Sequence, residues 1–188
     1  MNKPIYALML VLAGAGIVAG CKKDGAPSDA ASSEAAKPSA DTLTKALAGE
    51  AQFSTVSGAI KDTGLAGVFE GKASYTLFAP TNAAFAALGD PGKALMAPEQ
   101  RAALAALLRE HIVPGMLTKA DLTKALDAAG GKAVKLRSMG KGTLSLSKEG
   151  DKIVVTGADG AKGALTAEAA SAKNGSALGV DAVLKTVK

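Results

Sequence analysis

In the first two thirds of the chain, apolar side chains recur at intervals of three or four positions, the spacing of one helix face. The clearest case is 98–110, where Pro98 suits the first helical position. The same spacing predicts helical segments at 42–47, 53–60, 65–69, 81–88 and 118–130. Thr118 and Asp121 have the spacing of a capping box that would begin the last of these helices. Glycine and proline at 89–92 predict a turn.

Beyond Gly131 the apolar period changes from about 3.6 residues to two, which predicts strands. The predicted strands cover 133–136, 143–146 and 153–155, and glycine-containing turns join them. A last apolar segment, 180–187, closes the chain. Because the helices come first and the run of strands follows, the pattern predicts an α+β fold with a mostly antiparallel sheet.

The stretch 75–88 combines a strand, a turn and a helix. Residues 75–78 are β-branched, aromatic or apolar, which predicts a short buried strand. We expect Pro80 to end the pairing of this strand because proline has no N–H to donate. Thr81 or Asn82 can then cap a helix. Its predicted apolar face consists of Ala84, Phe85 and Leu88.

The N-terminal residues have the layout of an export signal. Residues 5–20 form an uncharged apolar run after Lys3, so residues 1–20 are predicted to be a signal peptide. The run ends in Val18-Ala19-Gly20-Cys21, which resembles a bacterial lipobox and implies lipid attachment at Cys21. A buried thiol or a reactive nucleophile fits this cysteine less well because it lies between an apolar leader and charged residues. Residues 21–41 lack large apolar side chains and are predicted to form a flexible tether.

Composition narrows the classes of partner. The chain has 188 residues and a formal net charge of +5, and residues 42–188 are enough for one domain. The basic residues are interspersed with acids, and aromatic residues are only 3%, so no nucleic-acid partner is predicted. The single cysteine rules out an internal disulfide and a metal site built from several cysteines.

Three motifs in the predicted domain resemble those of the fasciclin domain family. The first is Phe78-Ala79-Pro80-Thr81-Asn82 with Phe85, and the second is His111-Ile112-Val113-Pro114-Gly115. The third is Asn174-Gly175 followed by Asp181-Ala182-Val183-Leu184. The resemblance extends from 42 to 187 and implies a fasciclin-like fold, in which an N-terminal helical half packs on a mostly antiparallel β-sheet wedge. This chain departs from the family pattern at Leu178, where the family has histidine, at Gly179, where it has valine, and at Glu110, where it has an aromatic residue.

Each polar motif residue has a functional and a structural interpretation. His111 could be a metal ligand or a general base, but its place on an apolar helix face favours a hydrogen bond to the backbone. Asn174 and Gly175 could bind a ligand, but a turn with positive φ explains both. Asp181 could be a catalytic acid, but a backbone acceptor at the start of a strand is favoured. We therefore predict no catalytic residue, no metal site and no cofactor.

The predicted function is that of a non-catalytic binding module in cell adhesion or in interaction with the envelope or extracellular matrix, as the resemblance implies. The lipid on Cys21 would hold it to a bacterial membrane, and its partner would be another protein or a surface or matrix component. The alternative is a periplasmic carrier or sensor of a small apolar ligand, because an alanine-rich core can leave space unfilled. An enzyme is a third hypothesis and would need a pair of titratable groups that the sequence does not show.

Overall fold

The computed structural model describes residues 40–187. The predicted signal peptide, Cys21 and almost all of the predicted tether lie outside the described residues, so they stay predictions. Within 40–187, no helix has both the length and the apolar character needed to cross a membrane.

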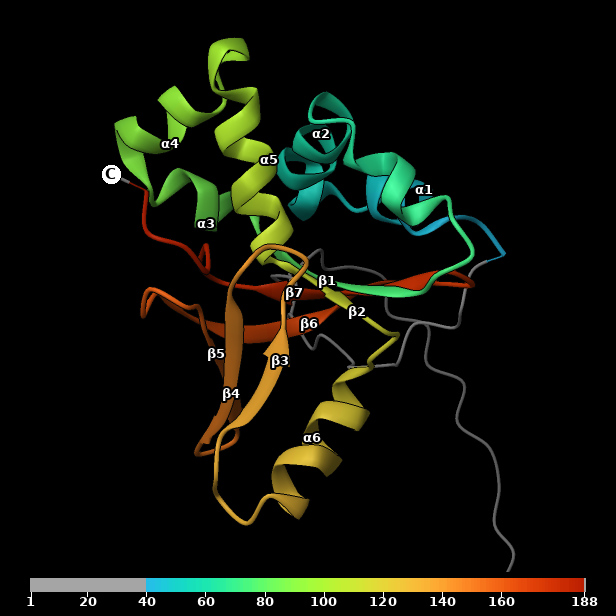
Figure 1. Ribbon diagram of the computed structural model, residues 1–188, viewed down its shortest axis with the longest axis vertical. Helices are drawn as coiled ribbons and strands as arrows, with labels where there is room; N and C mark the ends of the chain where they lie inside the picture. The colour runs from blue at the N-terminus through green and yellow to red at the C-terminus, as the bar shows by residue number, and fades with distance from the viewer. Residues whose placement is uncertain (1–39, 188) are drawn as a thin grey trace, which may run out of the picture. The chain divides into compact units, whose positions relative to one another are not determined.

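The first half of the described chain is helical, as the apolar spacing predicted (Figure 1). The α-helices and 3-10 helices (η) in this half are α1 (Leu43–Ala48), η1 (Ala51–Phe53), α2 (Ser54–Asp62), η2 (Leu65–Phe69), α3 (Asn82–Ala86), α4 (Gly89–Leu95), η3 (Pro98–Gln100) and α5 (Arg101–Glu110). The helix α6 (Lys119–Ala128) follows later and begins with the predicted capping box. The Thr118 hydroxyl accepts from Asp121 N at 3.2 Å, and the Asp121 carboxylate accepts from Thr118 N at 3.0 Å.

The turn predicted at 89–92 is wrong, because these residues form the first part of α4. Pro91 is compatible with a helix here because N–H groups in the first turn have no partner within the helix. Gly92 is buried where its backbone approaches Leu88, and an added Cβ would lie 3.0 Å from Phe85 O. The proline and glycine that predicted a turn therefore reflect the start of a helix and the close approach of Gly92 to Leu88.

After α6 the described chain is mostly strand, and two earlier strands lie among the helices, which confirms the α+β class. The strands are β1 (Tyr75–Pro80), β2 (Ile112–Pro114), β3 (Val134–Arg137), β4 (Thr143–Glu149), β5 (Lys152–Thr156), β6 (Lys162–Ala172) and β7 (Gly175–Val180). They form one seven-stranded sheet in the order β2-β1-β7-β6-β5-β4-β3. The pair β1 and β7 is parallel, and the other neighbours are antiparallel.

Two strands and one strand end differ from the expectations. The periodicity did not predict β6 or most of β7, which are rich in Ala, Ser and Gly rather than in β-branched residues. The predicted apolar segment 180–187 forms no strand after Val180. Pro80 is the last residue of β1 and pairs in register with Val180, so the strand continues two residues beyond Phe78.

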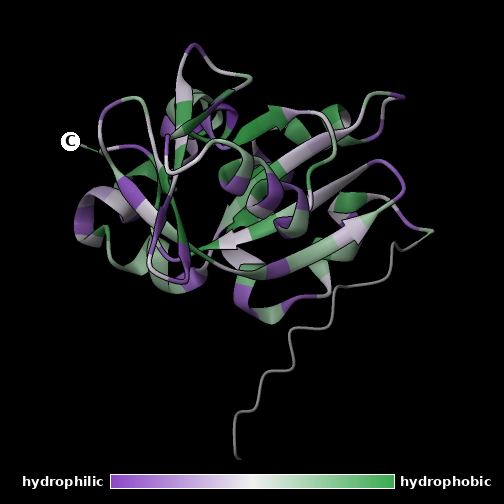
Figure 2. Cartoon of the chain, turned by 90° about the horizontal axis from the view of Figure 1, so that it is seen from below, coloured by the Kyte–Doolittle hydropathy of each residue, from purple (hydrophilic) through white to green (hydrophobic). Residues whose placement is uncertain are grey.

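Two apolar cores lie on opposite faces of β1. Leu77 and Ala79 belong to the core under α1 to α5, whereas Phe78 belongs to a second core between β1, β7 and the strands β3 to β6. The helix α6 contributes Leu122 and Leu126 to this second core. Figure 1 shows α1 to α5 on one side of β1 and β7, with α6 beside β3 and β4 at the other end of the molecule. In Figure 2 several connecting loops are hydrophilic, whereas much of the hydrophobic colour lies on strands and helices.

Candidate functional site

The three sequence motifs come together on three neighbouring strands. The first lies on β1 and the start of α3. The second runs from the end of α5 through β2, and the third lies at the two ends of β7. The pairing places Leu77 opposite Ile112 and Phe78 opposite Leu178. Successive motifs are about thirty and sixty residues apart in sequence, and the first and third are about ninety apart, so the sheet topology brings them together.

The polar residues of the first motif bind other parts of the fold. The Thr81 side chain caps α3 by accepting from Ala84 N at 3.2 Å, and Thr81 N donates to Val180 O at 3.1 Å. The Asn82 amide donates to Ala51 O at 2.9 Å and accepts from Thr55 N at 3.0 Å. Asn82 therefore ties the start of α3 to η1 and α2. Phe78 and Phe85 are both buried, but they pack in different cores.

The third motif also binds the backbone, but not in the way that the sequence predicted. Asn174 lies in the turn before β7, where its side chain accepts from Leu43 N at 2.9 Å and donates to Phe69 O. Gly175 is not among the positive-φ glycines and lies in β7 rather than in the turn. The explanation by positive φ is therefore wrong for Gly175, where an added Cβ would collide with Tyr75 O.

Asp181 follows β7 rather than starting a strand, so that part of the prediction is wrong as well. Its carboxylate accepts from Ala164 N at 2.6 Å, and its own N–H donates to Ala164 O at 3.1 Å. These two bonds hold the end of β7 to the start of β6. The carboxylate is a backbone acceptor, as expected.

His111 is fully buried at the C-terminal end of α5. Its Nδ1 lies 2.9 Å from Leu107 O, and its Nε2 lies 2.9 Å from Leu184 N. Since Leu107 O can only accept and Leu184 N can only donate, the ring is the neutral tautomer with its proton on Nδ1. Burial lowers the pKa of His111 from 6.5 to about 4, although the bond to Leu107 and the nearby Glu110 and Asp159 act in the opposite direction.

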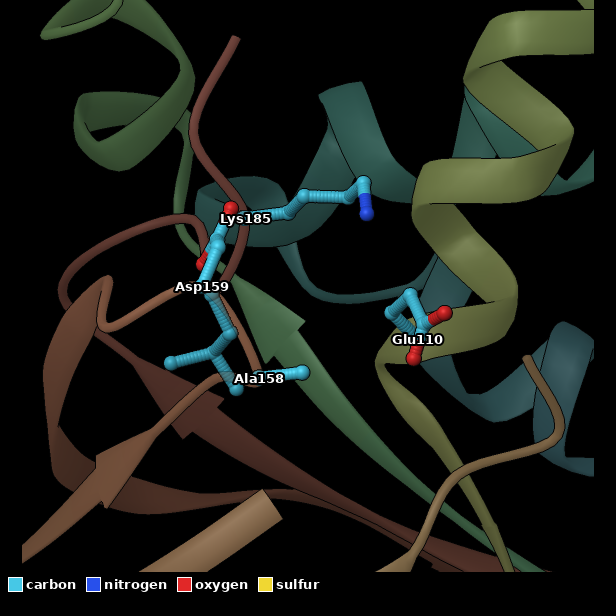
Figure 3. Close-up of a pocket in the computed structure, with 5 residues that line it drawn as sticks. Glu110, Ala158, Asp159 and Lys185 are labelled. Carbon is cyan, nitrogen blue, oxygen red and sulfur yellow. The ribbon is translucent and has the colours of Figure 1, made fainter. Parts of the chain in front are cut away.

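A small pocket is lined in part by Leu184, whose N–H binds His111, and Figure 3 shows the residues around this pocket. It is lined by Glu110, Ala158, Asp159, Leu184 and Lys185, and its cavity volume is about 10 Å³. That is the space of about one water molecule. Burial raises the pKa of Asp159, but hydrogen bonds from the N–H groups of Thr186 and Ala161 outweigh it, so the net shift is downward. Both carboxylates are bound to backbone N–H groups, and Figure 3 shows them on different elements.

Glu110 has a structural role that sequence reasoning missed. Its carboxylate accepts from Ser138 Oγ at 2.5 Å and from the N–H groups of Lys141 and Gly142 at 3.1 Å. It thereby joins the end of α5 to the turn between β3 and β4. The available signal was the turn 138–142, whose two glycines leave backbone N–H groups open to an acceptor.

The two other departures from the motif pattern fit the interior. Leu178 is fully buried in the second core. Gly179 lies where an added Cβ would be 2.9 Å from Phe53 Cζ and would collide with Thr166 Oγ1. Glycine at 179 thus lets the sheet and Phe53 approach closely.

The arrangement offers little chemistry. Both ring nitrogens of His111 are occupied, so the ring can neither bind a metal nor transfer a proton without breaking a bond of the fold. Among residues 40–187, no three side chains of His, Cys, Asp or Glu are grouped so that they could hold a metal ion.

Comparisons with known proteins agree with the motifs. The family model of the fasciclin domain matches residues 51–186. The chain is 40% identical over 91 residues to protein sll1483 of Synechocystis sp., and the aligned stretch covers 48% of this chain and 51% of that protein. It is 37% identical over 73 residues to the uncharacterized protein sll1735 of the same organism, and this aligned stretch covers 39% of this chain and 54% of that protein. The chain therefore spans about half the length of the curated relatives that it matches.

The fold resembles that of a FAS1 domain pair from the insect cell adhesion molecule Fasciclin I. The TM-score is 0.65 at 17% identity, and the match covers 77% of this chain and 51% of that chain. At this identity the likeness concerns the fold alone. Since the family model covers well over half of the chain, and the three motifs lie on adjacent strands of a matching fold, the chain belongs to the fasciclin domain family.

Proposed function

We propose that the protein is a membrane-tethered, non-catalytic binding module that acts in cell adhesion or in interaction with the envelope or extracellular matrix. Fasciclin domains are in general non-catalytic adhesion or binding modules. The observation that carries the non-catalytic part is the state of His111, the only histidine, whose two ring nitrogens are bound within the fold.

The tether is proposed from the sequence at Cys21. A Cys that follows an apolar leader and small residues suits lipid attachment, and several acyl chains would hold the protein at about 0.8 kcal/mol for each buried CH₂. Mass spectrometry of the protein purified from membranes should then find Cys21 as the first residue with a diacylglyceryl group. A free thiol at Cys21 would contradict the tether.

In the part of the chain that the structure describes, no observation favours the alternative function, a carrier of a small apolar ligand. The small pocket in Figure 3 has room for about one water molecule and is lined by charged side chains, whereas a carrier needs several hundred Å³ of mostly apolar space.

Cell attachment tests the proposed function directly. A strain without the gene should attach less to a matrix-coated surface than its parent, and the wild-type gene should restore attachment. A Cys21→Ser gene should produce folded protein in the soluble fraction and should not restore attachment. Equal attachment of the deletion strain and its parent would refute the adhesion role.

A further inference from the structure

Unpaired positive charge collects on the hairpin of β3 and β4. Residues 128–148 contain five basic residues and no acidic residue. One of the five, Lys148, pairs with Asp127 at 2.6 Å. The other four are exposed and form no ion pair with any residue in the described range 40–187. We call these four residues the basic stripe: Lys132, Lys135, Arg137 and Lys141.

The sheet places the stripe on an edge and on its outer face. The strand β3 is the last of the seven, so one of its edges has no neighbour in the described sheet. Lys135 and Arg137 alternate with Val134 and Leu136, which pack against the second core. The two basic side chains therefore leave the sheet on the face opposite to this core.

Hydroxyl groups continue this outer face away from the stripe. Lys135 pairs in register with Ser145, which pairs with Thr156 on β5, and Arg137 pairs with Thr143. Directly paired side chains in a sheet are about 5 Å apart at Cβ. The face thus offers cations along its edge and short hydroxyl side chains beside them.

Two acids that adjoin the hairpin are already engaged. Glu110 accepts three hydrogen bonds from the hairpin turn, so its carboxylate is directed to the turn itself. Glu149, at the far end of β4, pairs with Lys162 at 3.6 Å. Glu110 keeps its charge, but the four cations of the stripe outnumber this carboxylate, so the stripe keeps a positive field that favours an anionic partner.

The chemistry around the stripe narrows the class of anion. The sequence has no aromatic residue after Phe85, so the hairpin offers no aromatic ring to stack on nucleic-acid bases or on a neutral sugar ring. The large apolar side chains that are exposed in the described part are Met96 and Met116, and neither belongs to the hairpin. A membrane surface would therefore find no apolar side chain to insert there.

We propose that the hairpin of β3 and β4 binds a linear acidic polysaccharide, with the basic stripe on its carboxylates and the neighbouring hydroxyls on its sugar hydroxyl groups. The proposal rests on the proposed function and names the class of matrix component. Binding through exposed cations is sensitive to salt, since ions screen such contacts over about 8 Å at physiological ionic strength.

The test is direct binding in solution, independent of cell attachment. The full chain, purified in a nonionic detergent, is titrated with polygalacturonate, with uncharged dextran, with phosphatidylglycerol vesicles and with a single-stranded oligothymidylate. The variant K135Q/R137Q/K141Q removes three charges from the stripe. The matched control K61Q/K72Q/K173Q removes three exposed charges that lie away from the hairpin, on α2, before β1 and between β6 and β7.

Polygalacturonate should bind the wild-type chain and the control alike, and the stripe variant should bind about tenfold more weakly or worse. Dextran should not bind. Equal weakening in both variants would mean that only net charge matters and would overturn the proposal. Tighter binding to vesicles or to the oligonucleotide than to polygalacturonate would overturn it as well. A stripe variant that aggregates but still binds polygalacturonate would assign the stripe to protection of the sheet edge instead.

Discussion

The burial of His111 predicts a specific loss of stability in mild acid. In the unfolded chain its pKa would be near 6.5, and in the folded chain it is about 4. Since the folded pKa is the lower one, the unfolded chain takes up a proton first as pH falls. The contribution of this group therefore decreases between pH 6.5 and pH 4 and is constant below that range.

The magnitude follows from the difference between the two pKa values. A full difference of 2.5 units corresponds to roughly 3 kcal/mol at about 1.36 kcal/mol per unit, and about 2 kcal/mol of it falls between pH 7 and pH 5. Hydrogen bonds lower the pKa of Asp121. They also lower the pKa of Asp159, where they outweigh the effect of burial. The stabilisation that these two carboxylates give the folded chain is therefore lost only below about pH 4. Glu168, whose pKa is raised by burial and by Asp121, contributes with the opposite sign.

The assay is guanidinium unfolding at pH 7, 6 and 5 for the wild-type chain and for His111→Gln. The glutamine cannot titrate, and its carbonyl can accept from Leu184 N. The carboxylates titrate alike in both proteins, so the difference between the two proteins reports His111 alone. The wild-type free energy of unfolding should fall by about 2 kcal/mol more than that of the variant between pH 7 and 5. Because the chain has a single histidine, its imidazole ring protons can be assigned in proton NMR without ambiguity, and they should not titrate above pH 5 in the folded chain.

Two outcomes would refute this reasoning. The first is an equal decrease of stability in the wild-type chain and in His111→Gln. The second is an imidazole signal that titrates near pH 6.5 while the chain is still folded. The NMR measurement needs no variant, so it decides the question even if His111→Gln fails to fold.

Further predictions concern contacts that hold the site together. Replacing Glu110 with glutamine should lower the free energy of unfolding by about 1–3 kcal/mol, because hydrogen bonds to a charged acceptor are lost; a loss below 0.5 kcal/mol in urea unfolding would contradict this. Gly175→Ala should cost about 2 kcal/mol or more because the added Cβ collides with Tyr75 O. Its control, Gly58→Ala in α2, meets open space and should stabilise by about 0.5–1 kcal/mol; similar effects of both alanines on thermal unfolding would refute the steric argument. Asn82→Ala should cost about 2 kcal/mol, measured in the same way, because it breaks the bonds to η1 and α2.

Periodicity predicted the helices other than α4, and it predicted β3 and β4, because these elements have one apolar and one polar face. It missed α4, where glycine and proline indicated a turn, and β5 was found through its apolar residues, which are buried on both faces. It missed β6 and β7, whose Ala, Ser and Gly residues are buried but too small to produce a strong period. These two strands lie in the middle of the sheet, where neighbours on both sides bury them. Their placement depends on pairing with β1 and β5, which no local pattern shows.

For the candidate site too, local sequence predicted some contacts and missed those between distant segments. The place of His111 on an apolar helix face predicted a backbone hydrogen bond, and the structure has two. The turn with positive φ was a reasonable prediction for Gly175, but the true constraint is the approach of Tyr75, which is distant in sequence. Contacts between distant segments, such as Glu110 with the turn after β3, require the fold to be known.

Most polar motif residues that identify the family form hydrogen bonds within the fold. Asn82, His111, Asn174 and Asp181 bond to the backbone of other segments, so they determine the structure and leave little to contact a partner. Partner choice must then depend on surface that the motifs do not specify, and the basic stripe is such a surface. Substitutions in the motifs would lower stability and binding together, whereas substitutions in the stripe separate the two. For this reason, the stripe variant and its matched control are the informative pair for function.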